Sequence, residues 1–204
     1  MSYENKKFAI TLTIALAVLA AGAILMKMGT AKQGTNPELL NANNSTLSGS
    51  ANAKVTITEF GDFQCAACAE VEPLLRKVLD QYPGRVKLVW KDAPNSRLHP
   101  LAQRAAEAAR CAGEQGKFWE YHDRLLDQAQ SLTETGLSLT ARELGLNGSA
   151  FAECLESGRA TELVTRSLNE ALLLRVDATP YFFIGERRIS GAISEEELKK
   201  LLTE

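Results

Sequence analysis

Apolar residues occur in two arrangements along this chain: one unbroken run near the start and several periodic segments after it. Residues 8–26 contain no charged side chain, and lysines flank the run on both sides. As a helix with a rise of ~1.5 Å per residue, the run spans about 28 Å, close to the hydrocarbon thickness of a bilayer. Basic residues before such a run keep the N-terminus in the cytoplasm. We expect residues 1–7 to be cytoplasmic and residues 8–28 to be a single-pass transmembrane signal-anchor of the cytoplasmic membrane.

The segment after the apolar run predicts a tether to a domain on the far side of that membrane. Residues 29–53 are rich in Gly, Ala, Ser, Thr and Asn and show no apolar period, which is typical of a flexible linker. A cleaved signal peptide is the alternative, because Ala21-Gly22-Ala23 offers a cleavage site, but the apolar run continues past it. Under both interpretations we expect the remaining domain to be extracytoplasmic, in the periplasm.

The domain after residue 53 has strand patterns at both ends and helical periods between them. A strand, a helix and a strand come first, then a block of helices, then a hairpin and a capped last helix. These segments are residues 55–60, 65–82, 85–90, 97–176, 181–190 and 194–202. We therefore expect an α/β fold in which residues 54–96 and 177–204 form one domain, interrupted by an all-helical insertion at residues 97–176.

Charge and cysteine content exclude two classes of protein. The 204 residues include 23 Lys and Arg against 25 Asp and Glu, a net charge of −2. Four of the basic but only two of the acidic residues lie in the first 53, so the remaining domain is more acidic still. A nucleic-acid binder needs a basic surface, and a disulfide-stabilised miniprotein needs more than four cysteines. We expect a globular domain with an apolar core.

Cys65 and Cys68 form a C-x-x-C pair where a strand ends and a helix begins. The unpaired N–H groups and positive dipole of a helix N-terminus stabilise a thiolate, so we expect a low pKa for Cys65. Cys68, one turn further on, should be more buried and less acidic. Zinc would need two more ligands at similar spacing, and neither a second C-x-x-C nor His99 and His122 supply them. We expect thiol–disulfide chemistry with no metal and no cofactor.

The residues around this pair resemble the DsbA-like thiol:disulfide oxidoreductases of the thioredoxin superfamily. The similarity is carried by EFGDFQCAAC at residues 59–68, by ATPYFFIG at residues 178–185, and by parts of the helical block. It covers nearly all of residues 50–204 and implies a thioredoxin fold split by a helical insertion. It also implies an enzyme that introduces disulfides into reduced, unfolded exported proteins and is reoxidised by a membrane redox partner.

The resemblance assigns roles to three further residues. Pro180 would be a cis-proline beside the catalytic cysteines, whereas the pattern alone allows a trans edge-strand proline. Thr179 would bind substrate by presenting its backbone to an added strand. Glu59 would be the buried acid that helps move the proton of Cys68, the alternative being a solvent-facing strand residue.

Ala66 and Ala67 depart from the family pattern, in which better-known oxidants carry a proline and a histidine. Without the histidine the thiolate loses one stabilising donor, so we expect a weaker oxidant. A disulfide reductase or isomerase of the same fold is therefore one alternative. A non-catalytic binding module or metal carrier is another.

The two remaining cysteines and one histidine lie in the helical block. Four cysteines allow three pairings; if Cys65 and Cys68 form one bond, Cys111 and Cys154 form the other, a structural disulfide closing about 44 residues. Two buried free thiols are the alternative. His122 is expected on a helix surface or in a cap rather than near Cys65.

Overall fold

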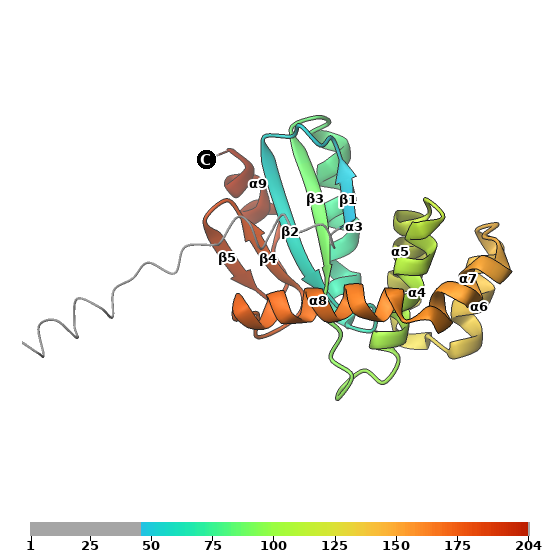
Figure 1. Ribbon diagram of the computed structural model, residues 1–204. Coiled ribbons are helices and arrows are strands. Elements are labelled where there is room, and N and C mark those ends of the chain that lie inside the picture. Colours follow the sequence, from blue (N-terminus) through green and yellow to red (C-terminus); the bar gives the residue numbers. More distant parts are fainter. Residues whose placement is uncertain (1–45, 204) are drawn as a thin grey trace, which may run out of the picture. The chain divides into compact units, whose positions relative to one another are not determined.

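The computed structural model describes residues 46–203 (Figure 1). The expected cytoplasmic segment, the signal-anchor at residues 8–28 and most of the linker lie outside this range. Within the described range, no helix combines the length and apolar character needed to span a membrane.

A five-stranded mixed sheet forms the centre of the fold, in the order β1-β3-β2-β4-β5. The central neighbours β2 and β3 are parallel, and the other neighbouring pairs are antiparallel. Strand β4 follows the insertion in sequence and pairs directly with β2. The strands are β1 (Thr46–Gly49), β2 (Val55–Gly61), β3 (Val86–Asp92), β4 (Tyr181–Ile184) and β5 (Arg187–Ser190).

Strand β1 corrects the expected linker at residues 29–53. It pairs antiparallel with β3, with Leu47 opposite Val89, and the indole Nε1 of Trp119 donates to the Leu47 carbonyl at 2.8 Å. The segment is polar apart from Leu47, so it carries no apolar period. Backbone pairing at the sheet edge makes it a strand, and its sequence pattern does not show this.

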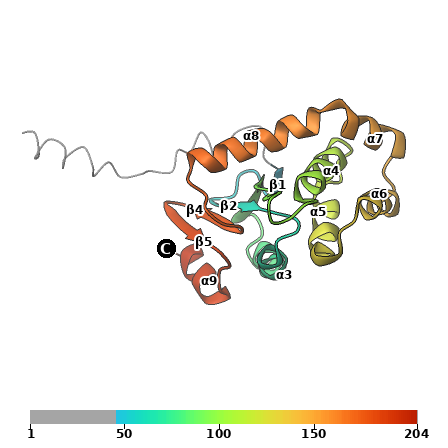
Figure 2. The same ribbon diagram turned by 90° about the horizontal axis from the view of Figure 1, so that it is seen from below.

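Helices cover both faces of the sheet, as Figure 2 shows. On one face, α3 and α9 pack on a core that includes Ile57, Leu88 and Phe182. On the other face, the C-terminal part of α8 packs on Phe60 and Phe183. The long helices are α3 (Ala66–Gln81), α4 (Ala102–Glu114), α5 (Phe118–Asp127), α6 (Glu134–Glu143), α7 (Gly148–Ser157), α8 (Arg159–Leu173) and α9 (Glu195–Thr203), with a 3₁₀ turn at Ala129–Ser131.

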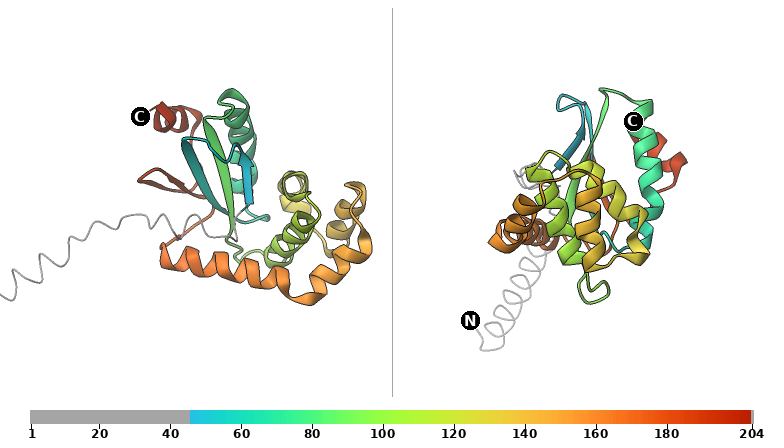
Figure 3. Two further views of the ribbon diagram at one scale, coloured as in Figure 1. Left: turned by 45° about the horizontal axis from the view of Figure 1, so that its top comes forward. Right: turned by 90° about the vertical axis from the view of Figure 1, so that its right-hand side faces the viewer.

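The expected helical insertion is present, and it has a core of its own beside the sheet (Figure 3). Trp90 of β3 joins this core to the domain. Its ring stacks on Phe63 with centroids 4.8 Å apart, and its Nε1 donates to Asp92 Oδ1 at 2.9 Å. Asp92 Oδ2 accepts from Arg110 of α4 at 2.6 Å, and all these groups are buried. Aromatic packing and a buried ion pair thus connect the insertion to the sheet.

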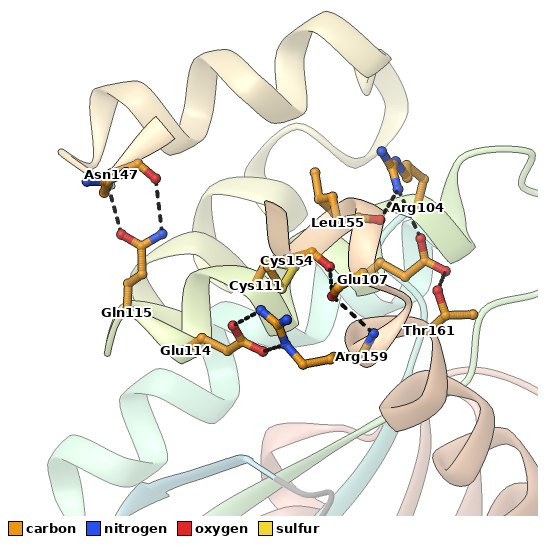
Figure 4. The surroundings of a disulfide bond; sticks show 11 residues. Arg104, Glu107, Cys111, Glu114, Gln115, Asn147, Cys154, Leu155, Arg159 and Thr161 are labelled. Carbon is orange, nitrogen blue, oxygen red and sulfur yellow. Dashed lines mark hydrogen bonds and ion pairs between the residues drawn. A yellow bond between two sulfur atoms is a disulfide. The ribbon is translucent and has the colours of Figure 1, made fainter. Parts of the chain in front are cut away.

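A disulfide between Cys111 and Cys154 ties α4 to α7 (Figure 4). Nearby polar contacts hold the same region together: Asn147 N, at the N-cap of α7, donates to Gln115 Oε1 at 2.8 Å, and Arg159 of α8 pairs with Glu114 of α4 at 3.2 Å. Both cysteines are fully buried, so the bond lies inside the insertion.

The contact between α3 and α5 contains a buried polar cluster, and it shows that the surface position expected for His122 is wrong. The His122 ring is fully buried, 4.5 Å from the Trp90 ring, and its Nδ1 lies 2.9 Å from Asp123 Oδ1. Burial lowers the pKa of His122, which favours the neutral ring. Glu72 faces this cluster from α3 and is 2% exposed, and Arg76 bridges Glu72 and Asp123 at 3.7 and 3.3 Å.

Glu72 is held largely protonated at neutral pH. Burial raises its pKa to about 8, and the nearby Asp123 carboxylate adds to the rise while Arg76 opposes it. Its Oε2 has no hydrogen-bond partner among the described residues. A carboxyl group in this environment favours the proton over the charge.

Removing the insertion's disulfide should lower the free energy of unfolding by about 4 kcal/mol, because the bond closes a long loop in the unfolded chain. Urea denaturation of Cys111→Ala/Cys154→Ala against the unaltered protein measures this. The matched control is Cys65→Ala/Cys68→Ala, which keeps the bond and should retain most of the stability. A loss under about 1 kcal/mol in the first variant would contradict the assignment.

Replacing Glu72 with glutamine should flatten the decline of stability between pH 5 and pH 8. The folded state holds this proton more tightly than the unfolded state, whose carboxyl titrates near 4.5, so the stability it confers is lost as pH rises towards about 8. The loss between pH 5 and pH 8 is about 3 kcal/mol. Urea denaturation at both pH values should show a smaller difference for Glu72→Gln than for the unaltered protein. Equal differences would show that Glu72 ionises normally.

Candidate active site

Cys65 occupies the N-cap of α3, at the junction where the chain leaves β2. Its backbone is extended, with φ −77° and ψ 120°, and no side chain caps the helix here. The loop before it is held by Asp62, whose carbonyl accepts from Cys65 N at 3.0 Å and whose Oδ1 accepts from Gln64 N at 2.8 Å. Because no side chain caps the helix, the first N–H groups of α3 can donate to the Cys65 sulfur.

The thiol of Cys65 is partly exposed and strongly acidic. Hydrogen bonding with the Cys68 side chain lowers its pKa the most, hydrogen bonding with Thr179 and with the backbone of Cys68 and Ala67 adds to this, and partial burial opposes it. The result is a pKa of about 5. At neutral pH the sulfur is therefore a thiolate, which is the nucleophilic form.

Cys68 lies one turn further along α3 in the opposite environment. It is fully buried, and burial raises its pKa well above the ordinary value, with the hydrogen bond to Cys65 acting in the same direction. The two sulfurs are not bonded to each other, so the structure shows the dithiol form. One exposed thiolate next to one buried thiol is the asymmetry that directional thiol exchange requires.

Glu59 lies in the middle of β2 and is fully buried, so its alternative placement on a solvent-facing side of the strand is wrong. Neither carboxyl oxygen has a hydrogen-bond partner among the described residues. Burial raises its pKa well above the usual value, and Glu72 and Cys65 add to the rise. The Glu59 carboxyl in turn raises the pKa of Cys68, though less than burial does.

The segment before β4 lies against the Cys65 sulfur. The Thr179–Pro180 peptide bond is cis, as the resemblance implies. The Thr179 carbonyl oxygen is 3.3 Å from Cys65 Sγ, across 114 residues of sequence. Of the residues expected to act together, Cys65, Thr179 and Pro180 lie where β2 ends and β4 begins, with Cys68 one turn into α3 and Glu59 within β2, whereas Cys111 and Cys154 lie in the insertion.

Two features of the site were not expected from the sequence. Asp62 Oδ2 accepts from Asn95 N and lies against His99 Nδ1, both at 2.8 Å, so it fixes the loop after β3 beside the cysteines. Gly61 must lack a side chain, because a Cβ there would lie 2.2 Å from the Trp90 ring. The Gly61-Asp62 pair at the end of a strand could have indicated this turn in the sequence, because glycine and aspartate favour tight turns.

The described residues contain one group with metal-ligand chemistry, and it is separate from the cysteines. Possible ligand atoms of Glu72, His122 and Asp123 lie within 4.8 Å of one another. Glu72 and Asp123 both already contact Arg76, and Asp123 also contacts the His122 ring. Cys65 and Cys68 form no such group with another ligand among the described residues.

Solved structures with this fold include a thioredoxin-like oxidoreductase and a thiol-disulfide exchange protein. A thioredoxin-like oxidoreductase from Silicibacter pomeroyi is 26% identical, with a TM-score of 0.74 over 83% of this chain and 96% of its own. The thiol-disulfide exchange protein alpha-DsbA2 from Wolbachia pipientis is 19% identical, with a TM-score of 0.74 over 82% and 90%. BdbD from Bacillus subtilis is 21% identical, with a TM-score of 0.70 over 78% and 91%.

Curated relatives include much longer proteins. The Na⁺/H⁺ antiporter NhaA 1 of Salinispora arenicola is 38% identical over 155 residues, which are 76% of this chain and 24% of the antiporter. NhaA 3 of Salinispora tropica is 39% identical over 150 residues, 74% of this chain and 23% of its own. The chain thus spans about a quarter of the length of these relatives.

The family assignment follows from a match over most of the chain. The family model described as Thioredoxin matches residues 41–204, which include both cysteines of the candidate site, the cis-proline and the whole insertion. The sheet order, the C-x-x-C pair at the start of α3 and the cis-proline before β4 agree with this match. The chain therefore belongs to the thioredoxin family, with a helical insertion within the fold.

Proposed function

We propose that this protein is a DsbA-like thiol:disulfide oxidoreductase that introduces disulfides into exported proteins. The observation that carries the proposal is the contrast between Cys65, partly exposed with a pKa of about 5, and Cys68, buried with a raised pKa. A stable thiolate at Cys65 makes it a good leaving group and stabilises the reduced enzyme, which favours transfer of the disulfide to substrate. A solved thiol-disulfide exchange protein and a thioredoxin-like oxidoreductase share this fold.

The proposed reaction moves two electrons from substrate to enzyme. A substrate thiolate attacks Cys65 Sγ of the oxidised enzyme, the Cys65–Cys68 bond breaks, and a mixed disulfide forms. Cys68 leaves as a thiolate and takes up a proton. Its raised pKa favours the protonated thiol, and the neighbouring Glu59, whose pKa is also raised, supplies the proton. A second substrate thiolate then attacks the substrate sulfur of the mixed disulfide, and Cys65 leaves as a thiolate. The substrate gains a disulfide and the enzyme becomes a dithiol.

Thr179 is proposed to hold the substrate chain during this exchange. Its carbonyl lies 3.3 Å from the reacting sulfur, so its backbone is placed to pair with an extended substrate segment. Pro180 contributes no N–H to such pairing, so the polar backbone groups available there are those of Thr179.

The proposed setting is the extracytoplasmic side of the cytoplasmic membrane. The apolar run at residues 8–26 supports a signal-anchor at residues 8–28, a cleaved signal peptide being the alternative. An anchor would keep the enzyme in the same plane as a membrane redox partner, raising the local concentration for reoxidation. The antiporter relatives support the presence of this domain within longer proteins, and we propose no ion transport for this chain.

The oxidised protein should restore activity to a reduced, unfolded protein that needs several disulfides. Cys65→Ala should abolish this activity, because the attacked sulfur is gone. Cys68→Ala, offered a disulfide-bonded substrate instead, should stop at a mixed disulfide, because its Cys65 thiolate displaces one substrate sulfur and no Cys68 thiol remains to release the other; dithiothreitol should remove the added mass. Absence of refolding with the unaltered domain, or full activity of Cys65→Ala, would overturn the proposal.

Alkylation of the reduced domain by iodoacetamide should modify Cys65 alone, with a rate that rises with pH around a midpoint near 5. Because the folded pKa is lowered from 9.0, this thiolate stabilises the reduced fold at high pH, and the contribution is lost as pH falls through about 5. In Cys68→Ala the midpoint should move up, since the largest cause of the low pKa is removed. A midpoint near 9 in the unaltered protein would contradict the assigned roles.

A further inference from the structure

The polar cluster between α3 and α5 is built from side chains of the types that bind metal ions. Glu72 comes from α3, and His122 and Asp123 come from consecutive positions of α5. One ligand atom of each residue lies within 4.8 Å of those of the other two. We call these three residues the α3–α5 cluster. The cluster does not include Cys65 or Cys68, so an ion held there would be separate from the thiol chemistry.

Two polar atoms of the α3–α5 cluster are buried without a hydrogen bond. Oε2 of Glu72 and Nε2 of His122 have no partner among the described residues, and the two residues are 2% and 0% exposed. A buried polar atom without a partner costs free energy, which a bound ligand can recover. Burial favours the neutral ring of His122, and neutral imidazole is the form that binds a metal. The contacts within the protein thus leave part of the cluster's binding capacity unused.

The charges around the cluster match a divalent cation. Asp123 and Asp127 both contact Arg76, at 3.3 and 3.5 Å. When Glu72 is ionised, these three carboxylates carry three negative charges against the single positive charge of Arg76, a net charge of −2. The contact between Arg76 and Glu72 is longer, at 3.7 Å, so Arg76 can keep Asp127 as a partner while Glu72 turns to an ion. The ion would take the place of the proton that Glu72 holds in the metal-free protein.

The ligand types favour zinc over calcium or magnesium. Calcium and magnesium take oxygen ligands at six or more positions, whereas imidazole is a typical ligand of zinc. Three protein ligands and one water complete a tetrahedral zinc site. With zinc–ligand bonds of ~2.0–2.1 Å, the ligand atoms of such a site lie about 3.4 Å apart, so the cluster must contract slightly. The Asp123 side chain is 32% exposed, which gives the ion and its water access from solvent.

We propose that the α3–α5 cluster is a zinc site, with Glu72, His122 and Asp123 as ligands and water in the fourth position. The inference goes beyond the proposed oxidoreductase function and does not depend on it. Helix α3 packs on the sheet and α5 belongs to the insertion, so a bound ion joins the two parts of the fold. The ligands come together only in the folded chain, and zinc therefore stabilises the folded state.

The test is isothermal titration calorimetry with zinc chloride on the chelator-treated protein. The protein is used in its oxidised form, in which Cys65 and Cys68 offer no thiolate to zinc. The ligand variant is Glu72→Gln, whose neutral side chain has the size and charge of the protonated carboxyl that the fold already holds. The matched control is Asp127→Asn, which removes a carboxylate that also contacts Arg76 but lies outside the cluster. Thermal unfolding with and without zinc gives a second readout and shows that each variant is folded.

The unaltered protein should bind one zinc ion per chain and unfold at a higher temperature with zinc than without it, whereas calcium and magnesium chloride should give neither effect. Glu72→Gln should weaken zinc binding at least about tenfold, because loss of even an outer partner of a metal ligand costs about 10–100-fold. Asp127→Asn should change the affinity by less than about threefold, as expected for an exposed charge. Absence of stoichiometric zinc binding, or equal affinities in the unaltered protein and Glu72→Gln, would overturn the site. Equal losses in the two variants would also overturn it, because they would show general attraction to acidic groups.

Discussion

The antiparallel pairing of β2 with β4 is the contact on which the site depends, because it joins two segments that the insertion separates. Phe60 lies opposite Tyr181, so the residues just before β4 run beside the loop that follows β2. This register brings the Thr179 carbonyl to the Cys65 sulfur. A slip of one residue would also exchange the faces of Phe182 and Phe183, which pack in separate cores on the two sides of the sheet.

The opposite properties of the two cysteines arise from one turn of one helix. Cys65 sits where the N–H groups of α3 are free and solvent is near, and Cys68 sits where the helix enters the core. The first environment favours the charged sulfur and the second favours the neutral one. Glu59 beneath them increases the contrast, because a buried carboxyl close to Cys68 further disfavours a charge there. The two cysteines therefore differ in reactivity because of where they lie in α3, although their side chains are identical.

The sequence predicts the strands, the insertion and the cysteine pair well, because these depend on local periods and short spacings. It fails for β1, whose strand depends on backbone pairing at a sheet edge. It also fails for His122, because burial of that ring results from packing between Trp90 and α5, which no local pattern encodes. Glu72 could have been found, since Cys68, Glu72 and Leu75 share one face of α3 at spacings of four and three residues.

The burial of the Cys111–Cys154 bond has a consequence for an enzyme whose reaction is thiol–disulfide exchange. A disulfide is exchanged only when a thiolate can approach one of its sulfurs along the S–S axis, and these two sulfurs lie in the interior of the insertion. Substrate thiolates that reach Cys65 therefore have no route to the second bond. The protein can cycle one pair of cysteines through many turnovers while the other pair keeps its oxidation state, and the fold itself acts as the barrier between the two.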